Sequence, residues 1–275
     1  TMFPKFEDIT KKQGDLLDKE FVNPKKAPYT LKTKIAGPFG TKLTTTLDYL
    51  TGGSLSALLS TEWTPVAGFK IDKLELQGKD GSLKTETTLT GGPLPEGLSF
   101  DFKADTSEKA DLGINFENDV VTADLCIDMV GMKKYSATVC SGTGPATYGA
   151  SVGLSSAEGF SVTDYSLGAT YSVSNCTTGV VVSDKLSTAK VTAGYTVNAD
   201  TTVVGTFAYP ENNFAVGGSY KCNPDTTVKV KVGSCKTINT SVKQDLGNKC
   251  SLVGMAAFKL DNIGSPDFGA SLTIG

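Results

Sequence analysis

The basic side chains of this chain are all lysines. There are 26 of them against 29 aspartates and glutamates, and the sequence contains neither arginine nor histidine. Bidentate guanidinium contacts to phosphate, imidazole metal ligands and imidazole general bases are therefore excluded. The net charge of −3 also lacks the basic excess that is typical of nucleic-acid-binding proteins. We accordingly expect no nucleic-acid partner.

Carboxylates and thiols are the other groups that could do chemistry, and they form no recognisable reactive site. Asp124 and Asp128 fall on one face of an expected strand, about 13 Å apart, which is too far to share a proton. Gly142-Thr143-Gly144 has no helix after it and so makes no phosphate loop. Without a C-x-x-C pair, six cysteines are interpreted as unpaired thiols packed as small apolar residues: Cys126, Cys140, Cys176, Cys222, Cys235 and Cys250. We expect no catalytic residue, no metal site and no cofactor.

The remaining chemistry is the attraction of anions by lysine ammonium groups, which act as point charges without selecting a geometry. On the wall of an aqueous channel, such lysines would bias it toward anions. The candidate residues are Lys11, Lys12 and Lys19 in an N-terminal helix and Lys32, Lys34, Lys229, Lys231 and Lys243 in strands. Acidic residues of the intervening strands would oppose them, namely Asp48, Glu62, Glu86, Asp101, Asp105, Asp111 and Glu117. For each lysine taken alone, the alternative of a merely solvated wall residue stays open.

Residues 3–21 are predicted to form the only helix, with Pro4 at its first position. Gly14 weakens the middle of this helix by about 1 kcal/mol relative to alanine, and Asn23 and Pro24 are expected to end it. Apolar residues fall near one face, namely Phe6, Ile9, Leu16 and Leu17. A short amphipathic helix of this kind is only marginally stable in water, so it needs a surface to lie against.

From residue 29 onward, apolar and polar residues alternate with the period of a β-strand. Turn sequences separate about nineteen such segments of roughly eight to eleven residues each. They start near residues 29, 42, 54, 69, 82, 97, 109, 121, 133, 146, 164, 176, 187, 201, 213, 226, 237, 250 and 267. Over 155–163, the pattern fits either a loop or a strand extension. No helix interrupts the series, so consecutive antiparallel hairpins are favoured over a parallel α/β sheet.

This alternation favours a closed membrane barrel over a soluble β-sandwich. A sheet of so many strands would have to split or close, and closure removes the edges that lipid does not tolerate. Strands of this length cross a bilayer when they are tilted, although no run reaches the roughly 18 apolar residues of a membrane-spanning helix. The polar face is charged and otherwise small, which suits a wide aqueous lumen. We expect an N-terminal helix and linker over 1–28 and a transmembrane β-barrel over 29–275. Aromatic residues near segment ends would form interfacial girdles: Tyr29, Tyr49, Trp63, Tyr135, Tyr209 and Tyr220.

Several stretches, in order along the whole chain, resemble the mitochondrial porins, the voltage-dependent anion channels. The N-terminal run 2–11, the first expected strand 29–34 and the run 220–231 carry the resemblance most specifically. The resemblance implies a nineteen-stranded barrel, which is the strand number of this channel family. The first and last strands would be parallel, and the helix would lie inside the pore.

The same resemblance implies a voltage-dependent, weakly anion-selective channel in the mitochondrial outer membrane. Metabolites, nucleotides and small ions would diffuse through it, membrane lipids would surround it, and a second copy or rim-docking proteins are candidate partners. Two alternatives stay open: the pore of the mitochondrial outer-membrane protein translocase, and a soluble β-sandwich binding module.

The last expected strand matches a polar-x-Gly-x-x-apolar-x-apolar pattern, which is read in mitochondrial barrels as an assembly signal: Asp267, Gly269, Leu272 and Ile274. Two positions depart from the family. The Gly-Leu-Lys element appears as Gly97-Leu98-Ser99, which puts a nucleotide contact by its lysine in doubt. A lipid-facing glutamate on the fourth strand is not expected either, because Glu75 lies on the polar side if Leu74 and Leu76 face lipid.

Overall fold

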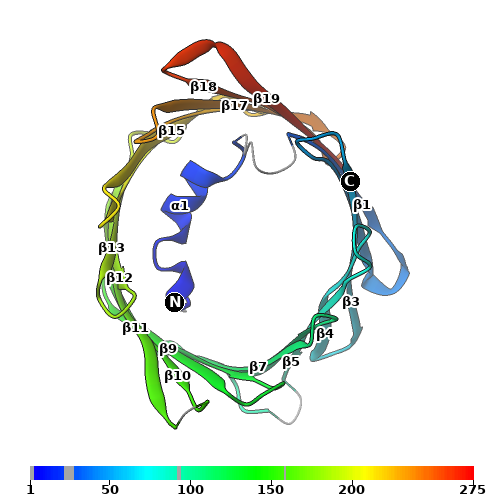
Figure 1. The fold of residues 1–275 in the computed structure, drawn as a ribbon, viewed down its shortest axis with the longest axis vertical. Helices are drawn as coiled ribbons and strands as arrows, with labels where there is room; N and C mark the ends of the chain where they lie inside the picture. Colours follow the sequence, from blue (N-terminus) through cyan, green and yellow to red (C-terminus); the bar gives the residue numbers. More distant parts are fainter. Residues whose placement is uncertain (1–2, 22–27, 92–93, 158) are drawn as a thin grey trace.

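The computed structural model describes residues 3–21, 28–91, 94–157 and 159–275. Figure 1 shows a single-walled ring of strands with the N-terminal segment inside it. The strands are β1 (Tyr29–Ala36), β2 (Lys42–Tyr49), β3 (Leu55–Val66), β4 (Phe69–Gln77), β5 (Leu83–Thr90), β6 (Leu98–Asp105), β7 (Lys109–Glu117), β8 (Val121–Asp128), β9 (Lys134–Thr143), β10 (Ala146–Ser155), β11 (Ser161–Val173), β12 (Cys176–Ser183), β13 (Thr188–Thr196), β14 (Thr201–Tyr209), β15 (Asn213–Asn223), β16 (Thr226–Gly233), β17 (Thr237–Gly247), β18 (Cys250–Lys259) and β19 (Asn262–Ile274). Short 3-10 turns occur at η1 (Phe6–Asp8) and η2 (Pro38–Gly40), and α1 is Lys11–Asp18.

The nineteen strands form one closed sheet in which sequence neighbours pair in antiparallel fashion. The ring closes where β1 pairs with β19 in parallel, from Tyr29 opposite Ala270 to Thr33 opposite Ile274. An odd number of strands that alternate in direction requires one such parallel pair. The predicted barrel, its strand count and its parallel seam are therefore confirmed, and the β-sandwich alternative is wrong.

The strand starts agree with the predicted ones to within one residue except at β11 and β19. β11 begins at Ser161 rather than 164, because a register shift at Gly153/Leu154 lets it pair with the end of β10. β19 begins at Asn262 rather than 267. Pro266 reads as a break in the sequence, but hairpin pairing with β18 extends the strand past it.

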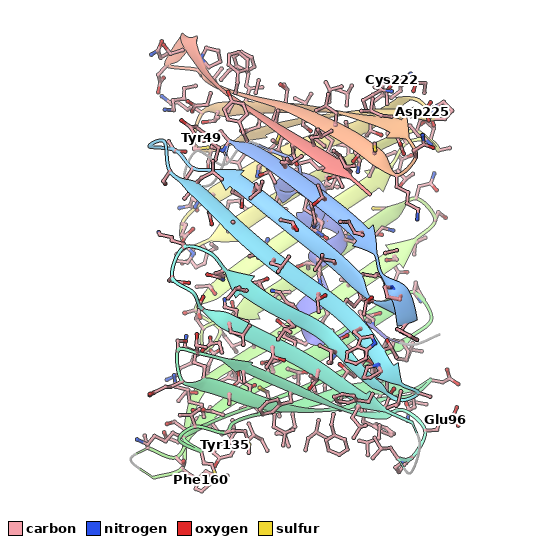
Figure 2. All side chains as sticks on the ribbon, turned by 90° about the vertical axis from the view of Figure 1, so that its right-hand side faces the viewer. Tyr49, Glu96, Tyr135, Phe160, Cys222 and Asp225 are labelled. Atoms are coloured by element: carbon pink, nitrogen blue, oxygen red, sulfur yellow. The ribbon has the colours of Figure 1, made fainter. Side chains whose placement is uncertain are left out.

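Alternation along the strands places most of the large apolar side chains on the outer wall and the charged ones in the lumen. On β4, Leu76 is 45% exposed on the outside, whereas Glu75 is 5% exposed and its carboxylate lies 2.6 Å from Lys73. The expectation that Glu75 faces away from lipid is confirmed. Figure 2 shows Tyr49, Tyr135 and Phe160 at one rim of the barrel. Neither α1 nor another described helix is long and apolar enough to span a membrane.

The cysteines are free, but their packing is mixed. Cys140 is buried, as the sequence interpretation requires, and Cys126 and Cys250 are partly buried. The interpretation is wrong for Cys176, Cys222 and Cys235, which are exposed because they lie at or just beyond strand ends.

The N-terminal segment is less helical than the predicted helix over 3–21. Pro4 precedes the helical turns, and neither Lys5 nor Thr10 caps a helix start with its side chain. The segment breaks into η1 and the eight-residue α1, because uncapped helix ends leave backbone N–H groups without partners. Beyond α1, Lys19 is extended and Glu20 has a left-handed backbone, with φ of 67°. Asn23 and Pro24, the expected stop, lie outside the described residues.

Candidate functional site

The N-terminal segment lies against the lumen wall, where inward-facing glycines let it approach the strands. A Cβ at Gly168 would lie 3.0 Å from the Ile9 side chain, and one at Gly217 would lie 2.7 Å from Leu17. We call these wall positions the glycine track; its members are Gly142, Gly149, Gly168, Gly179, Gly194 and Gly217. Because any larger residue would hold the segment off the wall, the track fixes where the segment can lie.

Three residues at helical spacing make the buried face of the segment. Ile9 is 5% exposed, Gln13 is 7% exposed and Leu17 is 2% exposed. Leu16, which was predicted on the same face, is only half-buried. Leu16 is one residue, about 100° of helix rotation, from Leu17 and so falls at the edge of this face. Burying a leucine side chain contributes about 1.5–3 kcal/mol, so Leu17 is a principal anchor.

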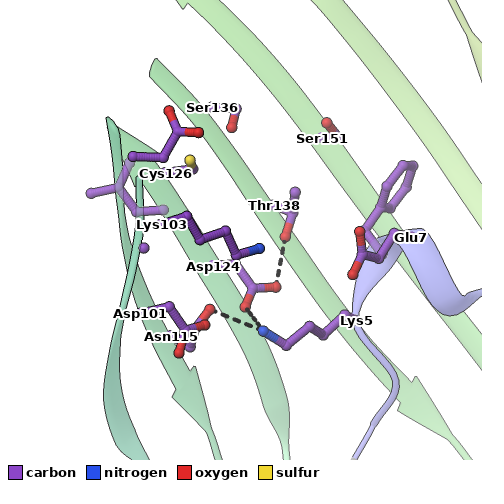
Figure 3. Close-up of a pocket in the computed structure, with 14 residues that line it drawn as sticks. Lys5, Glu7, Asp101, Lys103, Asn115, Asp124, Cys126, Ser136, Thr138 and Ser151 are labelled. Carbon is purple, nitrogen blue, oxygen red and sulfur yellow. Dashed lines mark hydrogen bonds and ion pairs between the residues drawn. The ribbon is translucent and has the colours of Figure 1, made fainter. Parts of the chain in front are cut away.

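The N-terminal end of the segment carries a positive charge into an acidic part of the wall (Figure 3). Lys5 Nζ donates to Asn115 Oδ1 at 3.0 Å and forms an ion pair with Asp124 Oδ1 at 3.0 Å. Asp124 also accepts a hydrogen bond from Thr138 at 3.0 Å. Burial alone would lower the pKa of Lys5, but the hydrogen bond and attraction of Asp124 outweigh it and raise that pKa.

A cavity of about 380 Å³ lies around this contact, between the N-terminal segment and strands β6 to β10. Asp101 and Asp111 line it, together with Lys103. Asn115, on the same wall, donates to Asp101 at 2.7 Å. The wall at this end of the segment therefore has an acidic character, which suits an ammonium group.

The C-terminal end of the segment carries negative charge to a basic part of the wall. Glu20 lies between two lysines, 2.7 Å from Lys229 and 2.9 Å from Lys243. Asp18 pairs with Lys231 at 3.0 Å. We call Lys229, Lys231 and Lys243, on β16 and β17, the lysine cluster. Burial would raise the pKa of Glu20, but hydrogen bonds from Lys229 and Lys243 lower it below its ordinary value.

The wall is thus segregated by charge, and the side chains by which the segment pairs with it match this segregation. Lys5 pairs with β7 and β8, whereas Asp18 and Glu20 pair with β16 and β17. Reversing the segment would bring like charges together at both ends. Electrostatics therefore fixes its direction, while the glycine track fixes its path.

The structure places the eight predicted lysines in three different settings. The lysine cluster comes together on adjacent strands and binds carboxylates of the segment. Lys11 and Lys19 pair within the segment, with Asp8 at 2.5 Å and with Asp15 at 2.6 Å. For Lys12, Lys32 and Lys34, no carboxylate of the described residues lies within 4.0 Å.

Two residues that organise the site, Lys5 and Glu20, were not among the sequence candidates. Asp124 was considered only with Asp128, as a carboxylate pair too widely spaced to share a proton. The one available signal was the uneven charge of the segment, because Asp15, Asp18 and Glu20 crowd its C-terminal end. The sequence could not show which wall strands would face those carboxylates.

The four residues of the assembly pattern occupy the seam strand β19. Asp267 lies opposite Ala257, and Gly269, which is buried, lies opposite Met255. Leu272 pairs with Leu31 across the seam, and Ile274 is 44% exposed on the outer wall. In Gly97-Leu98-Ser99, which differs from the Gly-Leu-Lys of the family, Gly97 precedes β6. Ser99 Oγ accepts a hydrogen bond from the Asn115 side-chain amide at 3.5 Å.

The family model described as eukaryotic porin matches residues 3–269 of this chain. Among solved structures, a double mutant of Rh. blastica porin is 12% identical and has a TM-score of 0.49, covering 80% of this chain and 91% of that one. A loop-deletion mutant of OmpT, an outer membrane protein of Vibrio cholerae, is 11% identical with a TM-score of 0.39, covering 88% and 93%. No curated protein matches. The match over nearly the whole chain shows that this chain belongs to the eukaryotic porin family, whose barrels are pores for diffusion.

Proposed function

We propose that this pore is a voltage-dependent, weakly anion-selective channel of the mitochondrial outer membrane, passing metabolites, nucleotides and small ions. The observation that carries this proposal is the inward placement of lysines on the wall near the seam. Lys32 and Lys34 have no carboxylate of the described chain at ion-pair distance, and the lysine cluster lies on β16 and β17, on the other side of the seam. Transport is diffusion down a gradient, without chemistry or a cofactor.

Anion preference should be modest because much of the lumen charge is already compensated. Glu20 and Asp18 cover the lysine cluster. On β3, Glu62 is paired with Lys42 at 3.1 Å and with Lys70 at 3.4 Å. Interactions between lumen charges and passing ions are further screened by salt within about 10 Å.

The reversal potential across a planar bilayer in a KCl gradient tests the selectivity. The purified protein should give a small potential of the sign that chloride preference produces. Lys32→Gln with Lys34→Gln should move it toward cation preference, because both changes remove uncompensated positive charge. Lys79→Gln, on the exposed turn between β4 and β5, is the matched control and should leave it unchanged. A strong cation preference of the unaltered protein would overturn the proposal.

Voltage dependence is supported by a charged body held inside the lumen. The N-terminal segment carries both signs of charge and is attached through a few ion pairs, so a membrane field exerts a force on it. Conductance should therefore fall as the applied voltage grows in either direction. A conductance that is independent of voltage would contradict this part of the proposal.

The protein-translocase pore is less well supported. Such a pore would bind basic presequences along a negatively lined lumen, whereas the lysine cluster opposes them. The proposed location in the mitochondrial outer membrane is supported by the family and by the resemblance of the N-terminal run 2–11. Fractionation of cells that express the tagged protein tests this location. Lipids would cover the apolar outer wall, and a second copy or rim-docking proteins remain the proposed partners.

A further inference from the structure

The lysine cluster already holds an anion, and that anion is part of the protein. Each oxygen of the Glu20 carboxylate meets a different lysine, Oε2 with Lys229 and Oε1 with Lys243. Asp18 supplies a second carboxylate to Lys231. Three ammonium groups on two adjacent strands thus form a site whose ability to bind anions is shown by its internal occupant.

Glu20, the main carboxylate in this site, has a backbone conformation that glutamate does not favour. Glu20 has φ of 67°, in the left-handed region where a Cβ crowds the following carbonyl. The residue before it is extended, so nothing in α1 forces this geometry. The two lysine contacts offset the conformational cost, and losing them would let the backbone relax.

The contacts are partly open to the lumen. The side chains of Lys243 and Asp18 are 44% and 66% exposed, whereas those of Lys229 and Glu20 are 15% and 25% exposed. Exposed ion pairs are individually weak, since water and salt compete for both partners. An anion with several charged oxygens could engage Lys229, Lys231 and Lys243 together, and it would lose less to screening than a single chloride.

We propose that Asp18 and Glu20 act as an internal competitor for the lysine cluster, and that a multivalent phosphate anion displaces them and frees the C-terminal end of α1 from β16 and β17. The ligand class is the oligophosphate group, whether free or carried by a permeating nucleotide. The other end of the segment stays docked, because Lys5 lies on a wall that repels anions. This inference rests on the proposed function, since such anions must enter the lumen.

A fluorescence reporter next to the cluster tests the displacement. The Phe21 ring lies 6.0 Å from Lys231 Nζ, and the chain has one tryptophan, Trp63, on the distant strand β3. Phe21→Trp combined with Trp63→Phe therefore places a single emitting group at the end of the segment. The full-length protein in lipid vesicles is titrated with sodium tripolyphosphate, and with sodium chloride at matched ionic strength. Solvent exposure of the reporter is followed by acrylamide quenching.

Tripolyphosphate should cause a saturable rise in quenching that chloride does not reproduce. Glu20→Gln removes the competitor and should lower the half-saturating tripolyphosphate concentration about tenfold, as expected for a charge-assisted contact. Glu7→Gln, which removes one carboxylate from the other end of the segment, is the matched control and should leave this concentration unchanged. Lys229→Gln with Lys243→Gln should abolish the saturable response.

Equal responses to both salts at matched ionic strength would show screening alone and overturn the proposal. An unchanged half-saturating concentration in Glu20→Gln would do the same. KCl conductance of the same preparation separates the two ideas. A pore that conducts without a tripolyphosphate response overturns only the displacement, whereas a preparation with the response but no conductance overturns the proposed function.

Discussion

Neighbouring residues of one type have unequal roles in the N-terminal segment. Leu16 and Leu17 differ by one position, yet Leu17 is 2% exposed against the wall, whereas Leu16 is half-buried. Lys5 and Glu20 are single charges whose partners lie on strands far away in the sequence. At this scale, the surroundings and not the residue type decide the contribution.

Leu17→Ala should therefore weaken docking of the segment by about 2–4 kcal/mol, through lost burial and the cavity left behind. Leu16→Ala is the matched control and should cost much less. Amide hydrogen exchange of α1 measures the difference, because an eight-residue helix is not stable on its own. Equal loss of protection in both variants would contradict the assigned buried face.

The two charged ends should respond to pH in opposite directions. The pKa of Glu20 is lowered from an ordinary value of 4.5, so its contribution to docking is complete above that value and is lost as pH falls through the lower docked pKa. The pKa of Lys5 is raised from 10.5, so its contribution is complete below 10.5 and is lost as pH rises further. Quenching of the Phe21→Trp reporter should rise in acid, and Glu20→Gln should remove that part of the transition. A reporter that gives the same acid profile with and without Glu20 would count against the assignment.

At the scale of elements, the N-terminal segment can pack against the wall because the wall strands carry glycines along the path of the segment. Glycine costs strand stability and is usually avoided inside strands. Here the glycine track coincides with the path of η1 and α1 across β9 to β15. The segment supplies the packing that the missing side chains do not.

Gly168→Leu should displace the segment while the barrel still forms. A Cβ there meets Ile9 at 3.0 Å and Phe6 at 3.2 Å, so a larger side chain occupies their space. Gly254→Leu on β18 is the matched control, since a Cβ there meets nothing within 4 Å. Protease cleavage within residues 3–21 should accelerate only in the Gly168 variant. Slow cleavage in both variants would show that the track does not determine docking.

At the scale of the whole molecule, closure decides which side of every strand meets water. The parallel pairing of β1 with β19 joins Leu31 to Leu272 on the outer wall. With the ring complete, every strand of the sheet has two neighbours, as hydrocarbon surroundings require. One face then contacts lipid, and the other encloses a lumen.

Lysine substitutions at adjacent seam positions should separate the two faces. Leu272→Lys places a charge on the outer wall and should cost roughly 1–4 kcal/mol, depending on depth in the bilayer. Ser271→Lys, one residue away and facing inward, should cost far less. Urea unfolding of both variants from lipid vesicles makes the comparison. A greater loss from Ser271→Lys would reverse the assigned faces.

The sequence by itself indicated about nineteen strands, a closed architecture and the face of most side chains in the clearly alternating strands. Period-two alternation is a local property, so Leu76 and Glu75 could be assigned to opposite sides without coordinates. Strand ends are set by hairpin pairing and not by the local sequence, and this pairing carried β19 past Pro266. Only the structure shortened the helix to Lys11–Asp18, whose start no side chain caps. It alone also joined Glu20 to Lys243, 223 positions away, because closure of the whole ring sets which wall strands the segment faces.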